Sequence, residues 1–542
     1  MIAPTEVGSR SQRDQRLLLI RVTASILIAL VVIRVAWIAD DSLITLRTAL
    51  NLANGFGAGF NPDESIQAYT HPLWFLLWLL IGTLTSQWIL GILVFGIACT
   101  TASVWVIFRQ ATEPWLIIAA FSALVFSNAF IEYAASGLEN PLSYLLLGVA
   151  TVLSWRISQP TNASDLSAFL LGISWAGIML TRADLVLFIL PLALYIVWSL
   201  RNQIRSLLLL LLSTLIPLIV WYSWSYTTYG SVVPNTFAAK RNVDISFSEI
   251  LFQGVRYIVL SVAQDPWTGI VLIVGITGTL LTGATFHKIS IVGVIFYLAY
   301  VLYIGGDFMS GRFLAVPVYV TVLSLVMAVS ERDRRSRLFT SIFPPAVGRQ
   351  SVVAVALFGV LPLLVFNSAN QPPTAIALPT TQRWDFGANA GIADERGFSV
   401  EQGRSLFDWY ETVGAQELIE DFSAAADANA RLNIGDLREL SSRWAEETDA
   451  EPVMDFGVAC GGLGSLAMST GPLVHWVDPC GLTDGFLASL PYTAYNLHWR
   501  AGHFERDLPA GYLEALQAGD PGKIADPQLA IRLRDVWERI RS

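Results

Sequence analysis

Residues 17–41 read LLLIRVTASILIALVVIRVAWIADD, an apolar stretch that ends on two adjacent acids, Asp40 and Asp41. A helix needs roughly 17–25 mostly apolar residues to cross the hydrocarbon core of a bilayer, and this stretch has that length. Arg21 lies near one end, where its side chain can reach the headgroups, whereas Arg34 lies deeper. The stretch therefore predicts a membrane-spanning helix that ends on a pair of carboxylates.

Similar apolar stretches recur over the first two thirds of the chain. They predict about eleven membrane spans, at residues 17–39, 87–108, 115–131, 141–156, 165–181, 183–200, 206–224, 267–286, 289–304, 314–330 and 350–367. The shorter run 72–84 is predicted to lie along the membrane interface, where Trp74 and Trp78 suit the depth of the headgroups. The sequence therefore predicts an α-helical polytopic membrane protein.

The charge of the chain changes near residue 367. Residues 1–367 contain 17 acidic and 21 basic residues, whereas residues 368–542 contain 26 acidic and 13 basic residues. We therefore predict a transmembrane domain over 1–367 and a water-soluble C-terminal domain over 368–542. Strand-like stretches near 453–459 and 473–477, with helical patterns over 401–421 and 527–541, predict a mixed α/β fold for the second domain. Its acidity dominates the net charge of −9, which argues against a nucleic-acid partner.

Basic residues predict the direction of the spans. Cytoplasmic loops are enriched in Arg and Lys, so the N-terminus with Arg10, Arg13 and Arg16 is predicted to be cytoplasmic. Alternating crossings then place further basic turns on the same side, at Arg109, Arg156, Arg201 with Arg205, His287 with Lys288, and Arg332 to Arg337. The other loops and the C-terminal domain are therefore predicted to lie outside the cytoplasmic membrane.

The Asp40–Asp41 pair is the sharpest candidate for chemistry, because ionised groups at membrane depth are costly and are often functional. The pair could act as a base for a hydroxyl, bind a metal, or stabilise a cationic sugar centre. A solvated helix end paired with Arg34 is the plain structural alternative. We predict that Asp40 and Asp41 are catalytic, and the sequence leaves open which of them is essential.

Basic side chains of the predicted outer loops suggest a phosphate site. Arg312 and Lys240 are the first candidates for binding a donor phosphate, and Arg182 and His71 are the next. The alternative for the arginines is interior ion pairing, of Arg312 with Asp307 and of Arg182 with Asp184. Further polar residues of the same loops are predicted to bind substrate: Arg47, Tyr69, Glu139, Asn235 and Asp307.

Cys460 and Cys480 lie in the predicted C-terminal domain, where an oxidising compartment would permit a disulfide between them. Cys99 lies in an apolar stretch and is predicted to be a buried free thiol. The residues require no cofactor, and they leave dependence on a divalent metal open.

Several motifs together resemble a known family. They are D-D-x-x-I-x-x-R (40–47), Q-A-Y-T-H-P-L-W (67–74), S-G-L-E-N-P-L (136–142), T-R-A-D (181–184), P-N-T…A-K (234–240), G-G-D-F-M-S-G-R-F (305–313), G-L-T-D (481–484), W-R-x-G-H-F (499–504) and L-P-x-G-Y (508–512). They resemble the actinobacterial terminal β-(1→2)-arabinofuranosyltransferases, which are polyprenyl-phosphate-dependent glycosyltransferases of the multi-spanning membrane C-type fold. The likeness runs from Asp40 to Tyr512, and Ala183 replaces the proline usual in that family.

The resemblance implies an enzyme that uses decaprenyl-phosphoryl-arabinofuranose as donor. It implies that arabinan chains of arabinogalactan, and of lipoarabinomannan, are the acceptors, and that the C-terminal domain helps to hold the glycan. The catalytic aspartate of that family lies in the first loop, here at Asp40 or Asp41. Two rival readings remain, a transferase for another polyprenyl-phosphate-linked sugar and a transporter of lipid-linked sugars. A non-enzymatic role in envelope assembly is a third.

Overall fold

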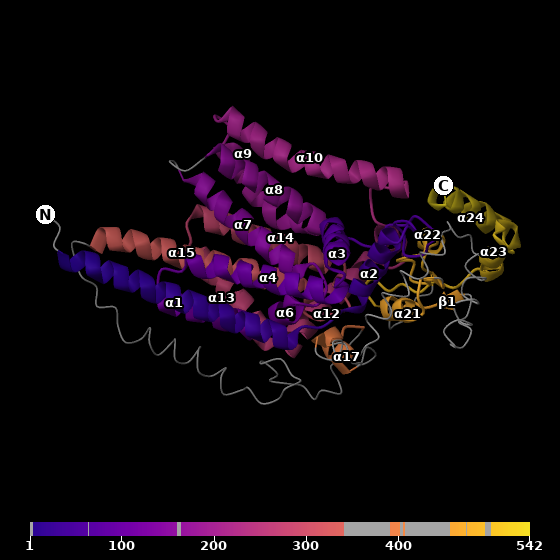
Figure 1. Ribbon diagram of the computed structural model, residues 1–542, viewed down its shortest axis with the longest axis horizontal. Helices are drawn as coiled ribbons and strands as arrows, with labels where there is room; N and C mark the ends of the chain where they lie inside the picture. The colour runs from indigo at the N-terminus through magenta and orange to yellow at the C-terminus, as the bar shows by residue number, and fades with distance from the viewer. Residues whose placement is uncertain are drawn as a thin grey trace. The chain divides into compact units, whose positions relative to one another are not determined.

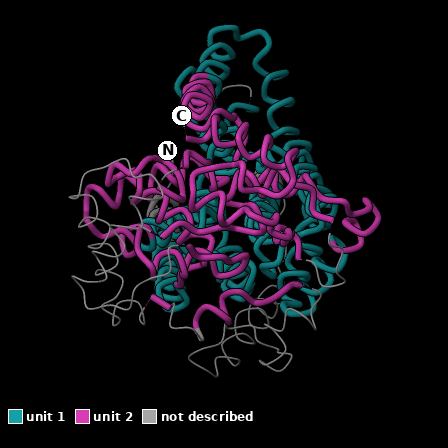
Figure 2. Tube along the Cα trace, turned by 90° about the vertical axis from the view of Figure 1, so that its right-hand side faces the viewer, with its two compact units in different colours: residues 1–36, 93–215, 254–384 teal, residues 37–92, 216–253, 385–542 magenta. Residues whose placement is uncertain are grey.

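The structure, a computed structural model, describes residues 4–62, 64–159, 164–340, 391–401, 405–406, 456–472, 474–493 and 500–541. The chain divides into two compact units (Figure 2). Unit 1 contains residues 1–36, 93–215 and 254–384, and unit 2 contains residues 37–92, 216–253 and 385–542. The C-terminal part of the chain therefore groups with two earlier segments. The predicted boundary between residues 367 and 368 lies outside the described residues.

Unit 1 is built of apolar helices (Figure 1). Its elements are α1 (Pro4–Val35), α5 (Pro114–Val125), α6 (Asn128–Ile131), η1 (Glu132–Ala134), α7 (Asn140–Ser158), α8 (Asp165–Thr181), η2 (Ala183–Leu185), α9 (Val186–Ser199), α13 (Pro266–Thr282), α14 (Thr285–Tyr303) and α15 (Arg312–Thr340). Parts of α4 (Trp88–Gln110), α10 (Ile204–Tyr229) and α12 (Phe247–Gln264) also belong to it. Large apolar side chains such as Leu19, Ile273 and Leu281 are exposed on these helices, which suits contact with lipid rather than water.

Among the described residues, six helices are long and apolar enough to cross a membrane, and two bent helix pairs would raise the number to eight. The six are Asp14–Val35, Trp88–Gln110, Asn140–Ser158, Ile204–Tyr229, Thr285–Tyr303 and Arg312–Asp333. Shorter apolar helices occupy Asp165–Thr181, Ala183–Ser199 and, as α3, Pro72–Thr85, where two further spans and an interfacial helix were predicted. The predicted span 350–367 lies outside the described residues. The polytopic helical fold is confirmed, and the number of eleven spans stays a prediction.

Two pairs of apolar helices are sharply bent, a feature that a hydropathy profile does not show. Helix α5 meets the segment Asn128–Ala134 at 77°, and α12 meets α13 at 108°. The Asp265 carboxylate makes hydrogen bonds at both bends. It accepts from the backbone N–H of Asn128 at 2.8 Å and from that of Thr268 at 3.2 Å. N–H groups at helix starts have no intrahelical partner and are costly to leave unsatisfied in an apolar environment. Asp265 therefore stabilises both broken helices.

Unit 2 joins the first loop to the C-terminal part of the chain. Its elements are α2 (Asp40–Ala53), α3, α11 (Asn235–Arg241), α17 (Glu395–Glu401), β1 (Phe456–Val458), α21 (Leu463–Ser469), β2 (His475–Val477), α22 (Gly485–Ser489), α23 (Tyr512–Ala518), η5 (Pro521–Lys523) and α24 (Pro527–Ile540). Strands β1 and β2 pair in parallel, at the places where two strands were predicted. The predicted helix over 527–541 corresponds to α24, and most of the predicted helix over 401–421 lies outside the described residues.

Two buried apolar clusters explain why these segments form one unit. In the first, Ile66 of the first loop packs with a set of C-terminal residues that includes Phe486 and Trp537. In the second, Ile44 and Phe60 pack with a set that includes Leu463, Val474 and Trp476. Since neither segment could bury these side chains alone, removal of apolar surface from water favours folding of the two together.

Candidate functional site

A glycine-rich loop, residues 305–313, leads into α15 in unit 1. Gly306 has a φ of +75°, and a Cβ at this position would overlap the ring of Tyr257, so only glycine fits. The Tyr257 hydroxyl accepts a hydrogen bond from the Phe313 N–H at 3.0 Å and donates to the Met309 carbonyl at 3.1 Å. The loop is therefore held at several points, and this fixes the position of the charged side chains that it carries.

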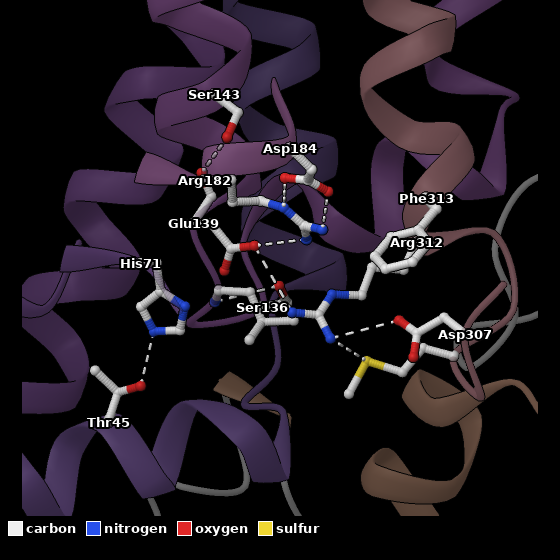
Figure 3. Close-up of polar contacts among 12 residues, drawn as sticks. Thr45, His71, Ser136, Glu139, Ser143, Arg182, Asp184, Asp307, Arg312 and Phe313 are labelled. Carbon is white, nitrogen blue, oxygen red and sulfur yellow. Dashed lines mark hydrogen bonds and ion pairs between the residues drawn. The ribbon is translucent and has the colours of Figure 1, made fainter. Parts of the chain in front are cut away.

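Four of the predicted residues come together in unit 1, in a buried charge cluster of Glu139, Arg182, Asp307 and Arg312 (Figure 3). Arg182 donates to Glu139 Oε1 at 3.0 Å and to both carboxylate oxygens of Asp184, at 3.0 and 2.6 Å. The Glu139 side chain is 0% exposed and that of Arg182 is 12% exposed. Buried carboxylates need such partners to remain ionised. Arg182 thus makes the ion pair with Asp184 that the sequence offered as the alternative to phosphate binding.

Arg312 makes longer carboxylate contacts than Arg182. Its Nη2 lies 3.7 Å from Glu139 Oε1, and its Nη1 lies 3.5 Å from Asp307 Oδ2. Both distances exceed the roughly 2.7–3.2 Å of an ordinary N–H···O hydrogen bond. Because one Glu139 oxygen contacts both guanidinium groups, that carboxylate keeps the two arginines close together. Arg312 Nη1 also donates to Met309 Sδ at 3.4 Å.

Asp40 begins α2 and contacts the C-terminal part of unit 2. One carboxylate oxygen accepts from the Gly464 N–H at 2.9 Å, and the other accepts from the Ser465 N–H at 2.9 Å and from the Ser465 hydroxyl. Both N–H groups lie in the first turn of α21, where the backbone has no intrahelical acceptor. Asp40 therefore has a fixed orientation and links the first loop to the C-terminal part. Asp41 follows it in α2 and is partly buried.

Arg47 and Asn235 make structural contacts within unit 2, and their substrate-binding role stays a prediction. The Arg47 side chain is fully buried. It donates to five backbone carbonyls, those of Phe60, Ala467, Gly471, Pro472 and Val474. The Asn235 amide donates to the carbonyls of Gly481, Leu482 and Asp484 at 2.8–3.2 Å. Both side chains donate these hydrogen bonds to backbone carbonyls of unit 2, which explains why polar residues occur at these two positions.

Tyr69 and His71 are also buried inside unit 2. The Tyr69 hydroxyl lies 2.9 Å from that of Tyr229, and its ring stacks on Phe75 with centroids 4.2 Å apart. His71 is 5% exposed, and its Nε2 hydrogen-bonds the Thr45 hydroxyl at 2.8 Å, as Figure 3 shows. These contacts tie α2 and α10 to the start of α3. They give Tyr69 and His71 little surface for substrate or phosphate.

Lys240 lies on α11 and is exposed. Its ammonium group lies beside a turn of the C-terminal part, since a Cβ built on Gly502 would be 3.0 Å from Lys240 Nζ. The next residue in the turn is His503. Burial, followed by the positive charges of Arg500 and Lys240, lowers the pKa of His503 to about 3, against the opposing effect of Asp40. Lys240 therefore belongs to a second charged group, formed within unit 2.

Cys460 and Cys480 form a disulfide in unit 2, with their Cα atoms 5.1 Å apart, and Cys99 is a buried free cysteine. Among the residues that the structure describes, no three His, Cys, Asp or Glu side chains converge as a metal-ligand group. Whether the activity depends on a divalent metal stays open.

The motif G-L-T-D at 481–484 contains a buried structural carboxyl. Asp484 caps α22 by accepting from the Leu487 N–H at 2.8 Å, and it accepts from the Tyr512 hydroxyl at 2.8 Å. Burial raises the pKa of Asp484 to about 6, although these hydrogen bonds favour the charged form. Burial likewise raises the pKa of Asp478 to about 6. Two of the C-terminal motifs thus meet through Asp484 and Tyr512.

Sequence reasoning did not assign a role to Arg500, His503 and Arg506. Arg506 is buried and donates to the carbonyls of Ala239, Cys480, Leu490 and Phe504 at 2.7–2.9 Å. Arg500 and His503 lie in the motif W-R-x-G-H-F, and Arg506 follows it by two residues. Lys240, which the turn contacts at Gly502, lies more than 250 residues earlier in the chain, so this contact could not be inferred from local spacing.

No family model matches this chain. Two curated relatives are similar to it, and both are named terminal β-(1→2)-arabinofuranosyltransferase. The protein from Corynebacterium glutamicum is 27% identical over 357 residues, which are 55% of this chain and 49% of the relative. The protein from Mycobacterium tuberculosis is 26% identical over 238 residues, 41% of this chain and 37% of the relative. The match thus spans half or less of each relative's length. It confirms the resemblance to this group of proteins.

Two solved structures are similar to the described fold at low sequence identity. One is ArnT from Cupriavidus metallidurans bound to undecaprenyl phosphate, with 12% identity, 93% of this chain and 78% of that chain covered, and a TM-score of 0.43. The other is the same protein in the apo state, with 14% identity, coverage of 87% and 76%, and a TM-score of 0.41.

Proposed function

We propose that this protein transfers arabinofuranose from decaprenyl-phosphoryl-arabinofuranose to the ends of arabinan chains, forming terminal β-(1→2) linkages in arabinogalactan or lipoarabinomannan. The observation that carries the proposal is the similarity to two proteins named for this activity. The buried cluster around Arg312 supports it, because residues of three motifs of the resemblance converge there in an apolar helical chain. A lipid-linked donor suits such a chain, since the polyprenyl tail can remain in the bilayer.

The helix ends of unit 1 support a single reactive side. Glu139, Arg182 and Arg312, all predicted to lie outside, meet at the starts of α7 and α15 and the end of α8. At the other ends of α7 and α15, Glu331 accepts from Trp155 at 3.3 Å and contacts His287 at 2.8 Å, near basic turns predicted to be cytoplasmic. We propose that the first cluster and the C-terminal part face outward across the cytoplasmic membrane, with the N-terminus inside.

In the proposed reaction the bond between the sugar's anomeric carbon and the lipid phosphate breaks. A bond to an acceptor hydroxyl forms, and that hydroxyl loses its proton. The departing phosphate monoester gains negative charge, which a guanidinium or ammonium group stabilises. Arg312 and Lys240 are assigned to this role. Arg182 is assigned to orienting Glu139, because its donors are already taken by carboxylates.

Asp40 and Asp41 are assigned to the reacting sugar or the acceptor hydroxyl. If the anomeric centre is inverted, one carboxylate takes the acceptor proton as the hydroxyl attacks. If configuration is retained, as the β-linked donor and product of the family imply, a carboxylate could act as nucleophile, stabilise an oxocarbenium-like centre, or orient the acceptor. The fixed orientation of Asp40 on α21 suits any role that requires a positioned carboxylate.

The test is incubation of the purified protein with radiolabelled decaprenyl-phosphoryl-arabinofuranose and a synthetic arabinan, followed by linkage analysis. The proposal predicts new terminal arabinofuranose in β-(1→2) linkage. Transfer only from lipid-linked mannose or galactofuranose would show that the donor is wrong. Movement of the labelled lipid across a vesicle membrane without glycan product would favour a transporter.

A further inference from the structure

The part of α12 that belongs to unit 1, from Gly254 to Gln264, has an exposed apolar face. Val255, Val259 and Ala263 are spaced four residues apart, so they lie on one side of the helix, and all three are exposed. Exposed apolar side chains that share one face of a helix mark a surface that contacts a membrane or another protein. This face therefore needs an apolar partner.

The opposite face of the same segment is polar and buried. Tyr257 and Ser261 are buried there and hydrogen-bond the loop 305–313, and the Ser261 hydroxyl accepts from the Gly311 N–H at 3.1 Å. Asp265, which follows the helix, is buried as well. A helix at the surface of a water-soluble protein has the reverse pattern, with its apolar stripe toward the core and its polar face toward solvent. The pattern of α12 therefore favours lipid over water around its exposed face.

The bend between α12 and α13 indicates the depth of this face in the bilayer. Exposed apolar side chains resume after the bend, at Ile270, Ile273 and Val274 of α13, so the lipid-facing surface of α13 begins beside α12. The two helices meet at 108°, so α12 does not follow the direction of α13. Arg256 is also exposed on α12, and a charged side chain costs less at the interface than in the hydrocarbon core. These features favour a helix that lies in the plane of the membrane.

We infer that the segment 254–264 of α12 lies in the interface of the bilayer, with Val255 and Val259 in contact with lipid at the boundary between headgroups and acyl chains. The partner of the exposed face is then the membrane itself. Because the opposite face of the segment binds the loop 305–313, the same contact places that loop, and Arg312 with it, at the membrane surface. The inference concerns the depth of these residues and holds for any donor or acceptor.

The test is depth-dependent quenching of a fluorophore on the full chain in phosphatidylcholine nanodiscs. Val259→Cys places a thiol on the exposed face of α12. The wild-type chain offers no competing accessible thiol, because Cys99 is buried and Cys460 and Cys480 form a disulfide. A bimane label at position 259 should be quenched about twofold more strongly by a nitroxide near the lipid headgroup than by one at the end of the acyl chain, as expected at a depth of ~5–10 Å.

Two further cysteine variants serve as matched controls. Ile531 of α24 has nearly the same exposure as Val259, 57% against 59%, and lies in the C-terminal part, so a label on Ile531→Cys should be quenched by neither nitroxide lipid. Ile273 lies in the middle of the apolar helix α13, so a label on Ile273→Cys should be quenched more strongly by the nitroxide at the chain end. Melting temperatures close to that of the unlabelled protein show that each labelled variant is folded.

Two results would overturn the inference. A label at position 259 that is as little quenched as the label at position 531 would mean that this face of α12 contacts water or protein. Strongest quenching by the nitroxide at the chain end, as at position 273, would mean that α12 lies in the hydrocarbon core as part of a broken span. The assay involves no transfer of arabinofuranose, so the inference and the proposed function fail separately.

Discussion

The two charged groups of the molecule differ in how their cations are engaged. In unit 1, the two arginines Arg182 and Arg312 share Glu139 and contact two further acids, so carboxylates outnumber cations. In unit 2, Lys240 and Arg500 lie near His503, whose pKa is lowered to about 3, and the acids Asp40, Glu395 and Glu505 also act on this group. The first group is an ion-pair network in which Arg312 makes the longer carboxylate contacts. The second differs in containing a histidine that is neutral at physiological pH.

This difference teaches that a basic residue in an outer loop is not by itself a phosphate ligand. Arg47, Arg182 and Arg506 all donate hydrogen bonds to carbonyls or carboxylates of the protein. Buried arginines of this kind stabilise the fold. The predictions below separate them from the residues assigned to chemistry.

The largest expected effect is on transfer. Asp40→Ala and Asp41→Ala should each lower the transfer rate by about 10²–10⁴-fold, the usual scale for loss of a positioned acid or base. Asp40→Ala should also lower the melting temperature, because it removes the cap of α21, a change of about 0.5–2 kcal/mol. Rates and melting curves of both variants, measured in the same nanodiscs, check this. Wild-type rates in both variants would contradict it.

A smaller effect is expected on the stability of unit 1. Arg182→Ala leaves the buried carboxylates of Glu139 and Asp184 without their main partner, at a cost of roughly 3–5 kcal/mol. Arg312→Ala should cost less stability and should raise the KM for the donor more, since its carboxylate contacts are longer. Thermal unfolding and donor titration of the two variants distinguish the roles. Equal loss of stability in both would remove the distinction.

Arg47→Lys tests the anchor between the first loop and the C-terminal part. Lysine keeps the charge but offers three donors on one nitrogen, so several of the five carbonyls lose their hydrogen bond. We expect a loss of about 1–3 kcal/mol in the free energy of unfolding. The donor KM of the folded protein should stay unchanged. A large rise in KM with no loss of stability would support the predicted substrate-binding role of Arg47 instead.

The smallest expected effect is on pH dependence. The folded-state pKa of His503, about 3, is below its unfolded value, so its contribution to stability is present above pH ~6.5 and is lost as the pH falls toward 3. Asp478 acts in the opposite sense, because its raised pKa of about 6 makes folding less favourable as the pH rises from ~4 through 6.

His503→Gln should therefore lose less stability than the wild type between pH 7 and 4. The difference should be about 2–4 °C in Tm, after allowance for solvent around the half-buried ring. Asp478→Asn should show the reverse, a steeper loss of stability on acidification than the wild type. Parallel Tm curves for the wild type and both variants would contradict these assignments.

Hydropathy predicted most of the helical body. Apolar runs of span length predicted helices at nearly every described position, because burial in lipid requires a continuous apolar helix. The bends at Asn128 and Asp265 were not predicted, since the carboxylate that stabilises both is more than 130 residues away from one of them. The grouping of residues 37–92 with the C-terminal part was also missed. It depends on packing of Ile66 and Phe60 against distant side chains, which composition does not report.

The candidate site was predicted in part. Motif residues Glu139, Arg182, Asp307 and Arg312 were named from sequence, and the structure brings them together. Residue type alone could not separate Arg312 from Arg182, because both are arginines beside an acid and only distances distinguish their pairing. Tyr69 and His71 were predicted to be site residues because residue type alone does not show which partner a side chain has. In the structure they hydrogen-bond Tyr229 and Thr45.

The most direct measurement of the central claim is arabinofuranose transfer from labelled decaprenyl-phosphoryl-arabinofuranose to a synthetic arabinan, compared between the wild type and the Asp40→Ala/Asp41→Ala double variant. The account predicts a terminal β-(1→2)-linked product with the wild type and none with the folded double variant. No product from the wild type, or equal product from both proteins, would contradict it.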